Sequence, residues 1–451
     1  MNISRLFNDK AFFRTLFVLA LPIMFQNLLH SLVNMLDTIM IGRLGTIEIA
    51  AVGLGNQVFF LLNMILFGAV SGAAVFTAQY WGKKDTSGIR QTTGLALIIV
   101  LSIGTLFTLL CLVFPRRIIG FYSADPAVIE QGALYLRAMA PSFIPFAISF
   151  VFMLVMRTTG KVKLAMTATA ISLSLNAVGN YVLIFGPGPF PELGVQGAGY
   201  ATVLARWVEL AIVLITVYGR RYVMAGTLRE FLSFDRAFAA KFVHIVTPVI
   251  INELFWAFGV TMQNVIFART GTAAMAAFNI TVTVSNLAWF IFIGLGNGAS
   301  VMVGNKIGEG NREEATEYAW KITRFSALLA AFVGVLLLPL SRLLPLFFNI
   351  ETDVLRTIYR MFIILMLTYP FRAFNMSVII GVLRAGGDTR YSIVFDLVFM
   401  WTVSIPLAAA ASFLFGWPAW VIYLCLVTEE PLKTILGYRR LSSGKWLHDV
   451  T

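Results

Sequence analysis

Hydrophobic residues occur along this chain in long stretches that are separated by short polar connections. A helix needs about 20 predominantly apolar residues to cross the hydrocarbon core of a bilayer. Twelve stretches reach that length, near residues 13–38, 50–78, 92–114, 128–155, 163–186, 196–218, 243–267, 274–303, 320–341, 355–383, 391–414 and 417–437. The pattern therefore predicts an all-α membrane protein with twelve transmembrane helices.

A set of polar and small residues appears twice, at a constant separation of 226 residues. The first copy comprises Pro22, Arg43, Gly45, Gly68 and Gly72, and the second comprises Pro248, Arg269, Gly271, Gly294 and Gly298. Each copy contains six predicted helices, and because six is even, the second copy enters the membrane from the same side as the first. We therefore expect two parallel six-helix repeats, an architecture known from secondary transporters.

The distribution of basic residues predicts the domain boundaries and the orientation. We expect a first lobe over 1–218, a cytoplasmic linker over 219–241, a second lobe over 242–440 and a cytoplasmic tail over 441–451. Lys and Arg concentrate at the termini and in every second connection, which is typical of the cytoplasmic side. Both termini are thus expected in the cytoplasm and the protein in the cell membrane. The net charge of +12 is explained by this placement of basic residues on the cytoplasmic side. The charge therefore does not indicate nucleic-acid binding.

The composition supports a membrane protein and disfavours an enzyme. Hydrophobic residues make up 59% of the chain and charged residues 12%, whereas roughly 25% of residues are charged in soluble domains. Cys111 and Cys425 both fall in predicted spans, which indicates neither a disulfide framework nor a metal site. The sequence contains no Walker loop, HExxH motif or GxSxG turn. We therefore expect no direct ATP hydrolysis, no enzymatic activity and no cofactor.

Two predicted helices carry polar stripes. The first helix places these side chains on one face, at spacings of 3, 4 and 3 residues: Asn27, His30, Asn34 and Asp37. The fifth helix has a similar stripe, formed by Thr169, Ser172, Asn176 and Asn180. An acid at the centre of a membrane helix costs at least about 2.5 kcal/mol, so Asp37 is expected to face protein or water.

If the two stripes face each other, their oxygen atoms form a site for a small cation. The residues expected to bind it are Asp37, Asn176, Asn180 and Asn34. Carboxylate and amide oxygens are ligands for hard cations such as sodium, and burial of the acid also favours its protonated form. The coupling ion is thus either sodium or a proton. The alternative is that the asparagines only link helices by hydrogen bonds, as His30 is also expected to do.

The second repeat differs chemically from the first. Glu253 in the seventh helix corresponds to Asn27, whereas the counterpart of Asp37 is Gln263. A carboxylate among aromatic rings suits an amphipathic organic cation, through charge pairing and cation–π contact. The residues expected to line such a substrate site are Glu253, Trp256, Met262, Trp289 and Phe374. The alternative is that these aromatic side chains face lipid or the helix core.

Two further acids lie within predicted spans. Glu209 follows Arg206 by three positions, which permits an ion pair within one helix. Asp396 is expected either to pair with Arg372 or the basic end of the tenth helix, or to join a cavity of the second lobe.

Six segments resemble the multidrug and toxic compound extrusion family, the MATE transporters. They are LPIMFQNLLHSLVNMLDTIMIGRLG, AQYWGKKD, MRTTGK, NAVGN, GVQGAGYATV and LRAGGDTR. Their order, spacing and duplication extend the resemblance over essentially the whole chain. It implies a V-shaped protein that exports cationic or lipophilic drugs in exchange for sodium ions or protons. Such a protein would act as a monomer, with small organic cations and membrane lipid as its partners.

Position by position, the resemblance matches Asp37 to the family's acid in helix 1, and Asn176 and Asn180 to its polar pair in helix 5. Some members carry a second Asp where this chain has Asn180, and NorM-type members have an acid in helix 10 that this chain lacks. The expected mechanism is alternating access, in which neutralisation of Asp37 weakens substrate binding.

Two other functions are weighed against export. A lipid-linked oligosaccharide flippase of the related superfamily would need a strongly cationic cavity, whereas only Arg206 and Arg372 lie deep in predicted spans. A membrane-embedded transferase would need an acidic metal-binding pair near the interface, and the sequence has none at a suitable place.

Overall fold

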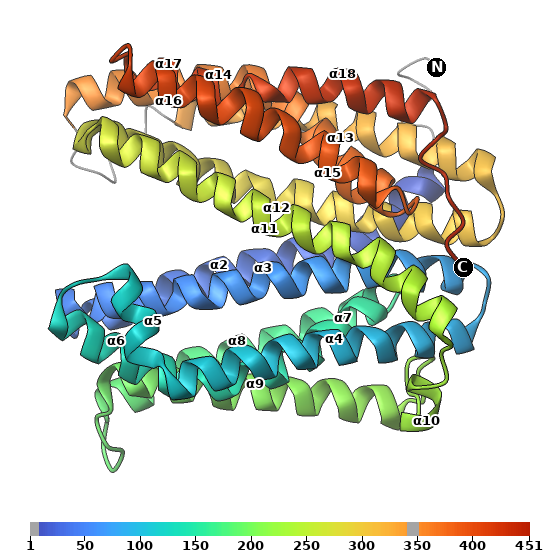
Figure 1. The fold of residues 1–451 in the computed structure, drawn as a ribbon, viewed down its shortest axis with the longest axis horizontal. Helices are drawn as coiled ribbons and strands as arrows, with labels where there is room; N and C mark the ends of the chain where they lie inside the picture. Colours follow the sequence, from blue (N-terminus) through green and yellow to red (C-terminus); the bar gives the residue numbers. More distant parts are fainter. Residues whose placement is uncertain (1–8, 341–350) are drawn as a thin grey trace. The chain divides into compact units, whose positions relative to one another are not determined.

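The structure, a computed structural model, describes residues 9–340 and 351–451, and every regular element in these ranges is helical (Figure 1). The first repeat contains α2 (Lys10–Gly42), α3 (Thr46–Gly82), α4 (Thr86–Val113), α5 (Pro115–Tyr122), α6 (Pro126–Met139), the short 3-10 helix η1 (Ala140–Ser142), α7 (Phe143–Thr158), α8 (Val162–Phe185) and α9 (Gly194–Gly219). The connection contains α10 (Leu228–Phe231). The second repeat contains α11 (Arg236–Thr270), α12 (Thr272–Gly308), α13 (Arg312–Leu340), α14 (Thr352–Met376), η3 (Ser377–Arg384), α15 (Thr389–Phe399), η4 (Met400–Ser404), α16 (Ile405–Phe413), α17 (Ala419–Val427) and α18 (Glu429–Ser442). The elements η3 and η4 are π-helical.

Eleven helical runs among the described residues are long and apolar enough to cross a membrane. The twelfth predicted stretch, 417–437, forms two helices, α17 and α18, which meet at Thr428. Each of these two helices is shorter than the roughly 20 residues that a membrane span needs. The last predicted span is therefore present as a broken helix, with Glu429 and Glu430 in the first turn of its second part.

The duplication is visible in the matching elements of the two repeats. Helices α3 and α12 each have 37 residues, and each begins directly after a glycine with positive φ. These glycines are Gly45, with φ 154°, and Gly271, with φ 137°. Only glycine adopts such angles without strain, so the same tight turn joins the first two helices of each repeat.

The chain divides into two compact units whose boundaries lie inside long helices. One unit comprises Phe25–Ile250, and the other comprises Ile251–Thr451 together with the part of α2 up to Met24. The rings of Phe12 and Tyr318 lie 5.1 Å apart in the latter, and those of Phe76 and Phe242 lie 5.3 Å apart in the former. The first part of α2 thus belongs to the unit built mainly from the second repeat. The first part of α11 belongs to the unit built mainly from the first repeat. The predicted lobe boundaries at 218 and 242 do not coincide with these units.

Two segments predicted as cytoplasmic connections are ordered by specific contacts. In the linker, a capping box between Thr227 and Glu230 begins α10, and the backbone N–H of Thr227 lowers the pKa of the exposed Glu230 carboxyl. In the tail, the Trp446 side chain is fully buried, and His448 donates a backbone hydrogen bond to Gly386. The tail is therefore packed on the unit that contains it.

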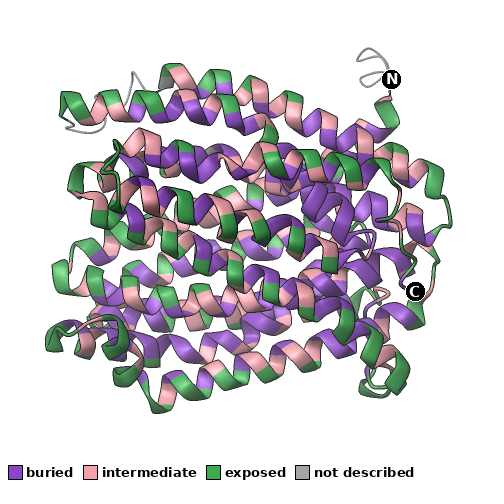
Figure 2. Cartoon of the chain, turned by 45° about the horizontal axis from the view of Figure 1, so that its top comes forward, coloured by how far each residue is buried: buried purple, intermediate pink, exposed green. Residues whose placement is uncertain are grey.

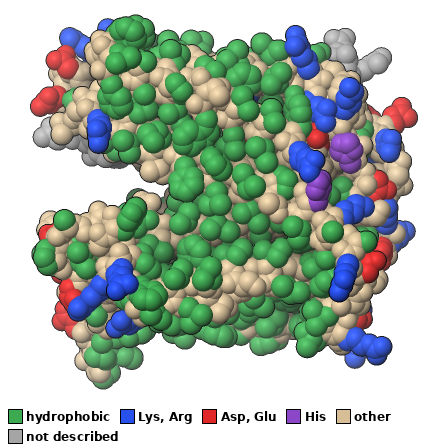
Figure 3. Space-filling model, viewed as in Figure 1, with side chains coloured by type: hydrophobic (Ala, Val, Ile, Leu, Met, Phe, Trp, Pro, Cys, Tyr) green, Lys and Arg blue, Asp and Glu red, His purple; other side chains and the backbone are tan. Residues whose placement is uncertain are grey.

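The outer surfaces of both units are apolar. Figure 2 shows buried and exposed residues alternating along the helices, as expected for helices with one face in a core. Exposed large hydrophobic side chains include Leu106, Leu109 and Val113 of α4 and Phe332 and Leu336 of α13. In the view of Figure 3, hydrophobic side chains cover the middle of the helices, and Lys, Arg, Asp and Glu gather towards their ends. This pattern is typical of a surface that faces lipid.

Gly68 allows α3 to approach α11 closely within one unit. A Cβ atom at Gly68 would lie 2.6 Å from the Cα of Ile250, which is backbone and cannot turn aside. We expect Gly68→Ala to destabilise the protein by about 1–3 kcal/mol, the usual cost of overpacking. Gly53→Ala on the same helix is the matched control, because nothing lies within 4 Å of its Cβ position. Thermal unfolding in detergent should give a lower Tm for the first variant only, and equal Tm values would contradict the close approach.

Candidate functional site

Asp37 lies near the end of α2 and its carboxylate faces another helix of the same unit. Its Oδ1 atom accepts a hydrogen bond of 2.6 Å from Nδ2 of Asn180 on α8. Asp37 is half-buried, whereas Asn180 is 2% exposed. Within the described chain, Oδ1 of Asn180 has no hydrogen-bond partner. The amide nitrogen of Asn180 therefore bonds the acid, and the amide oxygen of Asn180 is available to a ligand.

The polar stripe on α8 is buried along its length, as its spacing predicts. Its members are Thr169, Ser172, Asn176 and Asn180, all with exposed fractions of 7% or less. Gln26 of α2 donates a 2.5 Å hydrogen bond to Thr169, about three turns before the contact made by Asp37. Helices α2 and α8 are thus joined at two heights, by Gln26 and by Asp37.

Thr202 of α9 is a member of this group that the sequence interpretation missed. Its hydroxyl accepts a hydrogen bond of 3.2 Å from Nδ2 of Asn176. Thr202 is half-buried and lies in the segment GVQGAGYATV, where small residues let α9 pack closely on α8. A polar residue in such a small-residue segment was the available signal. Three helices therefore contribute oxygen atoms to one region, from Asp37, Asn176, Asn180 and Thr202.

Two other members of the α2 stripe are not bonded into this group. Asn34 is exposed, and His30 is half-buried. In the described part of the chain, no hydrogen bond joins the side chain of either residue to Asp37. Asn34 lies one turn before Asp37 on the same face, so it remains a candidate by position and not by contact.

Two basic side chains of the same unit, Arg206 and Arg157, bond groups other than Asp37. Arg206 forms the predicted ion pair with Glu209 at 2.8 Å, and its guanidinium lies 4.8 Å from the ring of Phe146. Arg157 donates a 2.5 Å hydrogen bond to Gln26. Asp37 differs from Glu209 because the group bonded to it is a neutral amide. Its negative charge is therefore not balanced by a bonded base.

Glu253 has a different environment in the other unit. Its carboxylate accepts a 2.5 Å hydrogen bond from Arg384, and both side chains are at most 10% exposed. The two partners are 131 residues apart, the same separation as Gln26 and Arg157. The two links are thus similar in place, although at the 226-residue spacing the counterpart of Glu253 is Asn27 and that of Gln26 is Asn252. Because Arg384 balances the charge of Glu253, the structure does not favour Glu253 as the counter-ion of a cationic substrate.

The aromatic candidates for a substrate site do not form one cluster. Trp289 packs against Tyr369, and the guanidinium of Arg372 lies 5.0 Å from its ring. Phe374 is 8% exposed and belongs to a hydrophobic core cluster, so its ring contributes to packing instead of lining an open path. Trp256 is half-buried and Met262 is 40% exposed. In the described residues, no ring contact or hydrogen bond joins these candidates.

Asp396 pairs with a base of the twelfth helix and not with Arg372, one of the partners expected for it. Asp396 accepts hydrogen bonds from Asn252 at 3.0 Å and from Lys433 of α18 at 3.2 Å. Arg372 instead forms an ion pair of 3.4 Å with Glu430. The apolar stretch 417–437 predicts a membrane helix, but it does not indicate that Lys433 and Glu430 on this helix pair with other charged groups.

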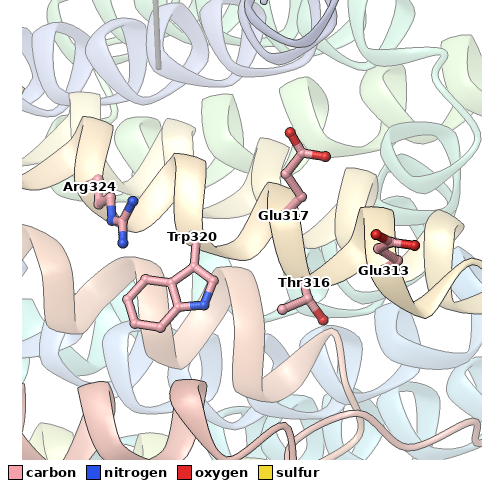
Figure 4. A pocket seen from close by; sticks show the side chains of 5 residues that line it. All are labelled: Glu313, Thr316, Glu317, Trp320 and Arg324. Atoms are coloured by element: carbon pink, nitrogen blue, oxygen red, sulfur yellow. The ribbon is translucent and has the colours of Figure 1, made fainter. Parts of the chain in front are cut away.

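A pocket of about 620 Å³ lies elsewhere, along one face of α13 (Figure 4). It is lined by Glu313, Thr316, Glu317, Trp320 and Arg324. All five residues belong to one helix, and the guanidinium of Arg324 lies 5.0 Å from the ring of Trp320. None of the predicted ion-binding or substrate-binding residues lines this pocket. Among the described residues, no group of three or more His, Cys, Asp or Glu could hold a metal ion.

The MatE family model matches residues 22–182 and 248–410 of the chain. The chain belongs to the MATE family of transporters. The two matched segments begin 226 residues apart, which is the separation of the repeated landmarks. Both the family resemblance and the duplication predicted from the sequence are therefore confirmed.

Related MATE sequences and structures match almost the full chain. The uncharacterized transporter YisQ of Bacillus subtilis is 26% identical, over 97% of this chain and 96% of its own. A probable multidrug resistance protein NorM of Thermotoga maritima is also 26% identical, over 96% of this chain and 93% of its own. The crystal structure of MATE in complex with MaL6 has a TM-score of 0.85 at 21% identity, over 96% of both chains. These matches confirm an all-α, multi-pass membrane transporter of two six-helix repeats.

Proposed function

We propose that this MATE transporter is a secondary active antiporter of the cell membrane, with both termini in the cytoplasm. It exports organic cations or lipophilic drugs in exchange for sodium ions or protons, by alternating access, and acts as a monomer. The observation that carries this proposal is the bond between Asp37 and the neutral amide of Asn180. Relatives named probable multidrug resistance proteins support the substrate class.

The site offers a small cation a negative charge and neutral oxygen atoms. Asp37 supplies the charge, and the oxygen of Asn180 is buried without a partner in the described chain. Asn176 and Thr202 supply further oxygen atoms beside it. Oxygen donors of this kind suit sodium, and a proton would bind the Asp37 carboxylate itself. In either case binding neutralises the acid.

Neutralisation of Asp37 is the step that links ion and substrate. A ligand shifts a conformational equilibrium only by the difference between its affinities for the two states. With its charge free, Asp37 attracts a cationic substrate, and with an ion bound it does not. The membrane potential adds about 2.3 kcal/mol per charge per 100 mV to inward movement of the ion.

The charge distribution does not support the flippase alternative. A pyrophosphate group would need unpaired basic side chains deep in the membrane. Arg206 and Arg372, the two bases that the sequence places deep in predicted spans, form ion pairs with Glu209 and Glu430. The substrate proposal therefore rests on the charge of Asp37.

Transport by the purified protein in liposomes tests the proposal. Uptake of a fluorescent organic cation is followed while a sodium gradient or a pH gradient is imposed separately, with protein-free liposomes as the baseline. We expect one of the two gradients to drive transport above that baseline, and its identity names the coupling ion. If neither gradient drives transport, antiport of organic cations is wrong.

Thr202→Val provides a milder test of the ion site. The substitution preserves shape but removes the hydroxyl that accepts the hydrogen bond from Asn176. We expect the concentration of ion needed for half-maximal transport to rise by up to about tenfold, the equivalent of one hydrogen bond. Thr167→Val is the matched control, because the Thr167 hydroxyl is exposed on α8 and bonds only its own helix. Identical ion dependence in the two variants would remove Thr202 from the site.

A further inference from the structure

Lys433 of the broken twelfth helix lies between two buried acids. Its Nζ atom is 3.2 Å from Asp396 on α15 and 3.3 Å from Glu429, one turn earlier on α18. The three side chains are at most 12% exposed. One positive charge is thus shared by two carboxylates in a place where water does not screen them.

The other buried acids of this unit each have a base of their own. The ion pairs in the described residues join Glu253 to Arg384, Glu430 to Arg372 and Asp388 to Arg440. Two of these pairs are close to the cluster in sequence, since Glu430 follows Glu429 on α18 and Glu253 follows Asn252, which bonds Asp396. They are neutral as pairs and leave no positive charge over for Asp396 and Glu429. The cluster therefore carries one negative charge in excess if all its acids are ionised.

Two oxygen atoms beside the shared lysine lack partners. Glu429 is 6% exposed, and its Oε2 atom has no hydrogen-bond partner in the described chain. Asn252 is 1% exposed, and while its Nδ2 donates to Asp396, its Oδ1 is likewise unpartnered in the described part of the protein. A buried carboxylate oxygen that bears charge without a partner is strongly unfavourable. Burial of a neutral carboxyl oxygen in the same place costs much less free energy.

We infer that Asp396, Glu429 and Lys433 form a second proton-binding site, in which the two carboxylates share one proton that resides on Glu429. Like charges held close together in a buried place cannot both remain ionised. The ligand is a proton and not a metal ion, because the Lys433 ammonium already occupies the position between the carboxylates and would repel a second cation. The site lies in the second repeat and goes beyond the proposed antiport, which uses Asp37 of the first.

The site gives the second repeat a charge that can change during a transport cycle. Release of the proton would leave Asp396 and Glu429 competing for Lys433, in a helix that is already interrupted at Thr428. The cluster lies entirely within one compact unit, and Asp37 belongs to the other. A role in coupling would add a second proton to each cycle.

Infrared spectroscopy of the purified full-length protein tests the site directly, through the carbonyl stretch of a protonated carboxylic acid. The parent for all spectra is Asp37→Asn, so that the first repeat does not contribute. Glu429→Gln and Asp396→Asn are then added separately and compared with this parent at pH values on both sides of neutrality. Glu317→Gln is the matched control, because Glu317 is an exposed acid that pairs with a lysine.

We expect the parent and the control to show the carboxylic acid band, and both test variants to lose it. Glu429→Gln removes the group that holds the proton. Asp396→Asn leaves Lys433 with a single acid to balance, so Glu429 gives up its proton although it is unchanged. Absence of the band from the parent, or its persistence in either folded test variant, would overturn the site. Because two different variants are predicted to act alike, a folding failure of one leaves the other to decide.

The readout is independent of transport. If Asp37 proves not to couple export, the band of Glu429 is still expected. If the band is absent while Asp37 couples export, only the second site is wrong.

Discussion

Asp37→Asn is expected to reduce gradient-driven efflux to the level of protein-free liposomes while the protein stays folded and inserted. The substitution removes the negative charge but keeps the size of the side chain. Asn180 can still donate to the oxygen of the new amide, so the link between α2 and α8 is retained. Without the charge, this site no longer binds a proton or sodium with different affinities in the two states of the transporter. The ion gradient therefore no longer drives the transport cycle.

Asp353→Asn is the control for this variant. Asp353 is an acid of α14 with a side chain 89% exposed, and its ion pair with Arg356 lies on the surface. It should leave efflux unchanged, because exposed pairs contribute only about 0–1 kcal/mol. Full gradient-dependent efflux by the Asp37→Asn protein, at equal insertion, would mean that the coupling site lies elsewhere.

Arg384→Met should be among the most destabilising single substitutions in the chain. It leaves the buried carboxylate of Glu253 without the base that balances it. Breaking a buried ion pair in this way costs about 3–5 kcal/mol, because the remaining charge stays desolvated. Thermal unfolding in detergent should therefore show a large drop in Tm.

The double variant Arg384→Met with Glu253→Gln separates charge from packing. If the uncompensated carboxylate causes the loss, neutralising it should restore most of the stability. Arg356→Met serves as the surface comparison and should change stability by no more than about 1 kcal/mol. A double variant as unstable as Arg384→Met would show that Arg384 acts through packing or other contacts and not through Glu253.

Much of the fold could be predicted because each element leaves a local signal. The apolar stretches predicted the membrane helices, and the repeated landmarks predicted the duplication that the family match confirms. The break in the last helix was not predicted, since it falls within a stretch that is apolar on average. The exchange of the first turns of α2 and α11 was also missed, because apolar residues do not specify which partner they pack against.

The candidate site was predictable where two stripes share a helical period. Spacing placed Asp37 and Asn180 on the polar faces of their helices, and the structure joins them. Spacing does not predict which faces meet, so the partners of Glu253 and Asp396 were not found. Arg384 is 131 residues from Glu253, and only the packing of helices brings such residues together.

Equilibrium binding of a fluorescent organic cation to the purified protein tests the central claim most directly. That claim is that one negative charge at Asp37 serves the substrate and the coupling ion in turn. Kd is measured at a series of pH values and sodium concentrations for the wild type and for Asp37→Asn. The account predicts that Kd of the wild type rises with the concentration of the coupling ion and that Kd of the variant does not. The same dependence in both proteins would contradict it.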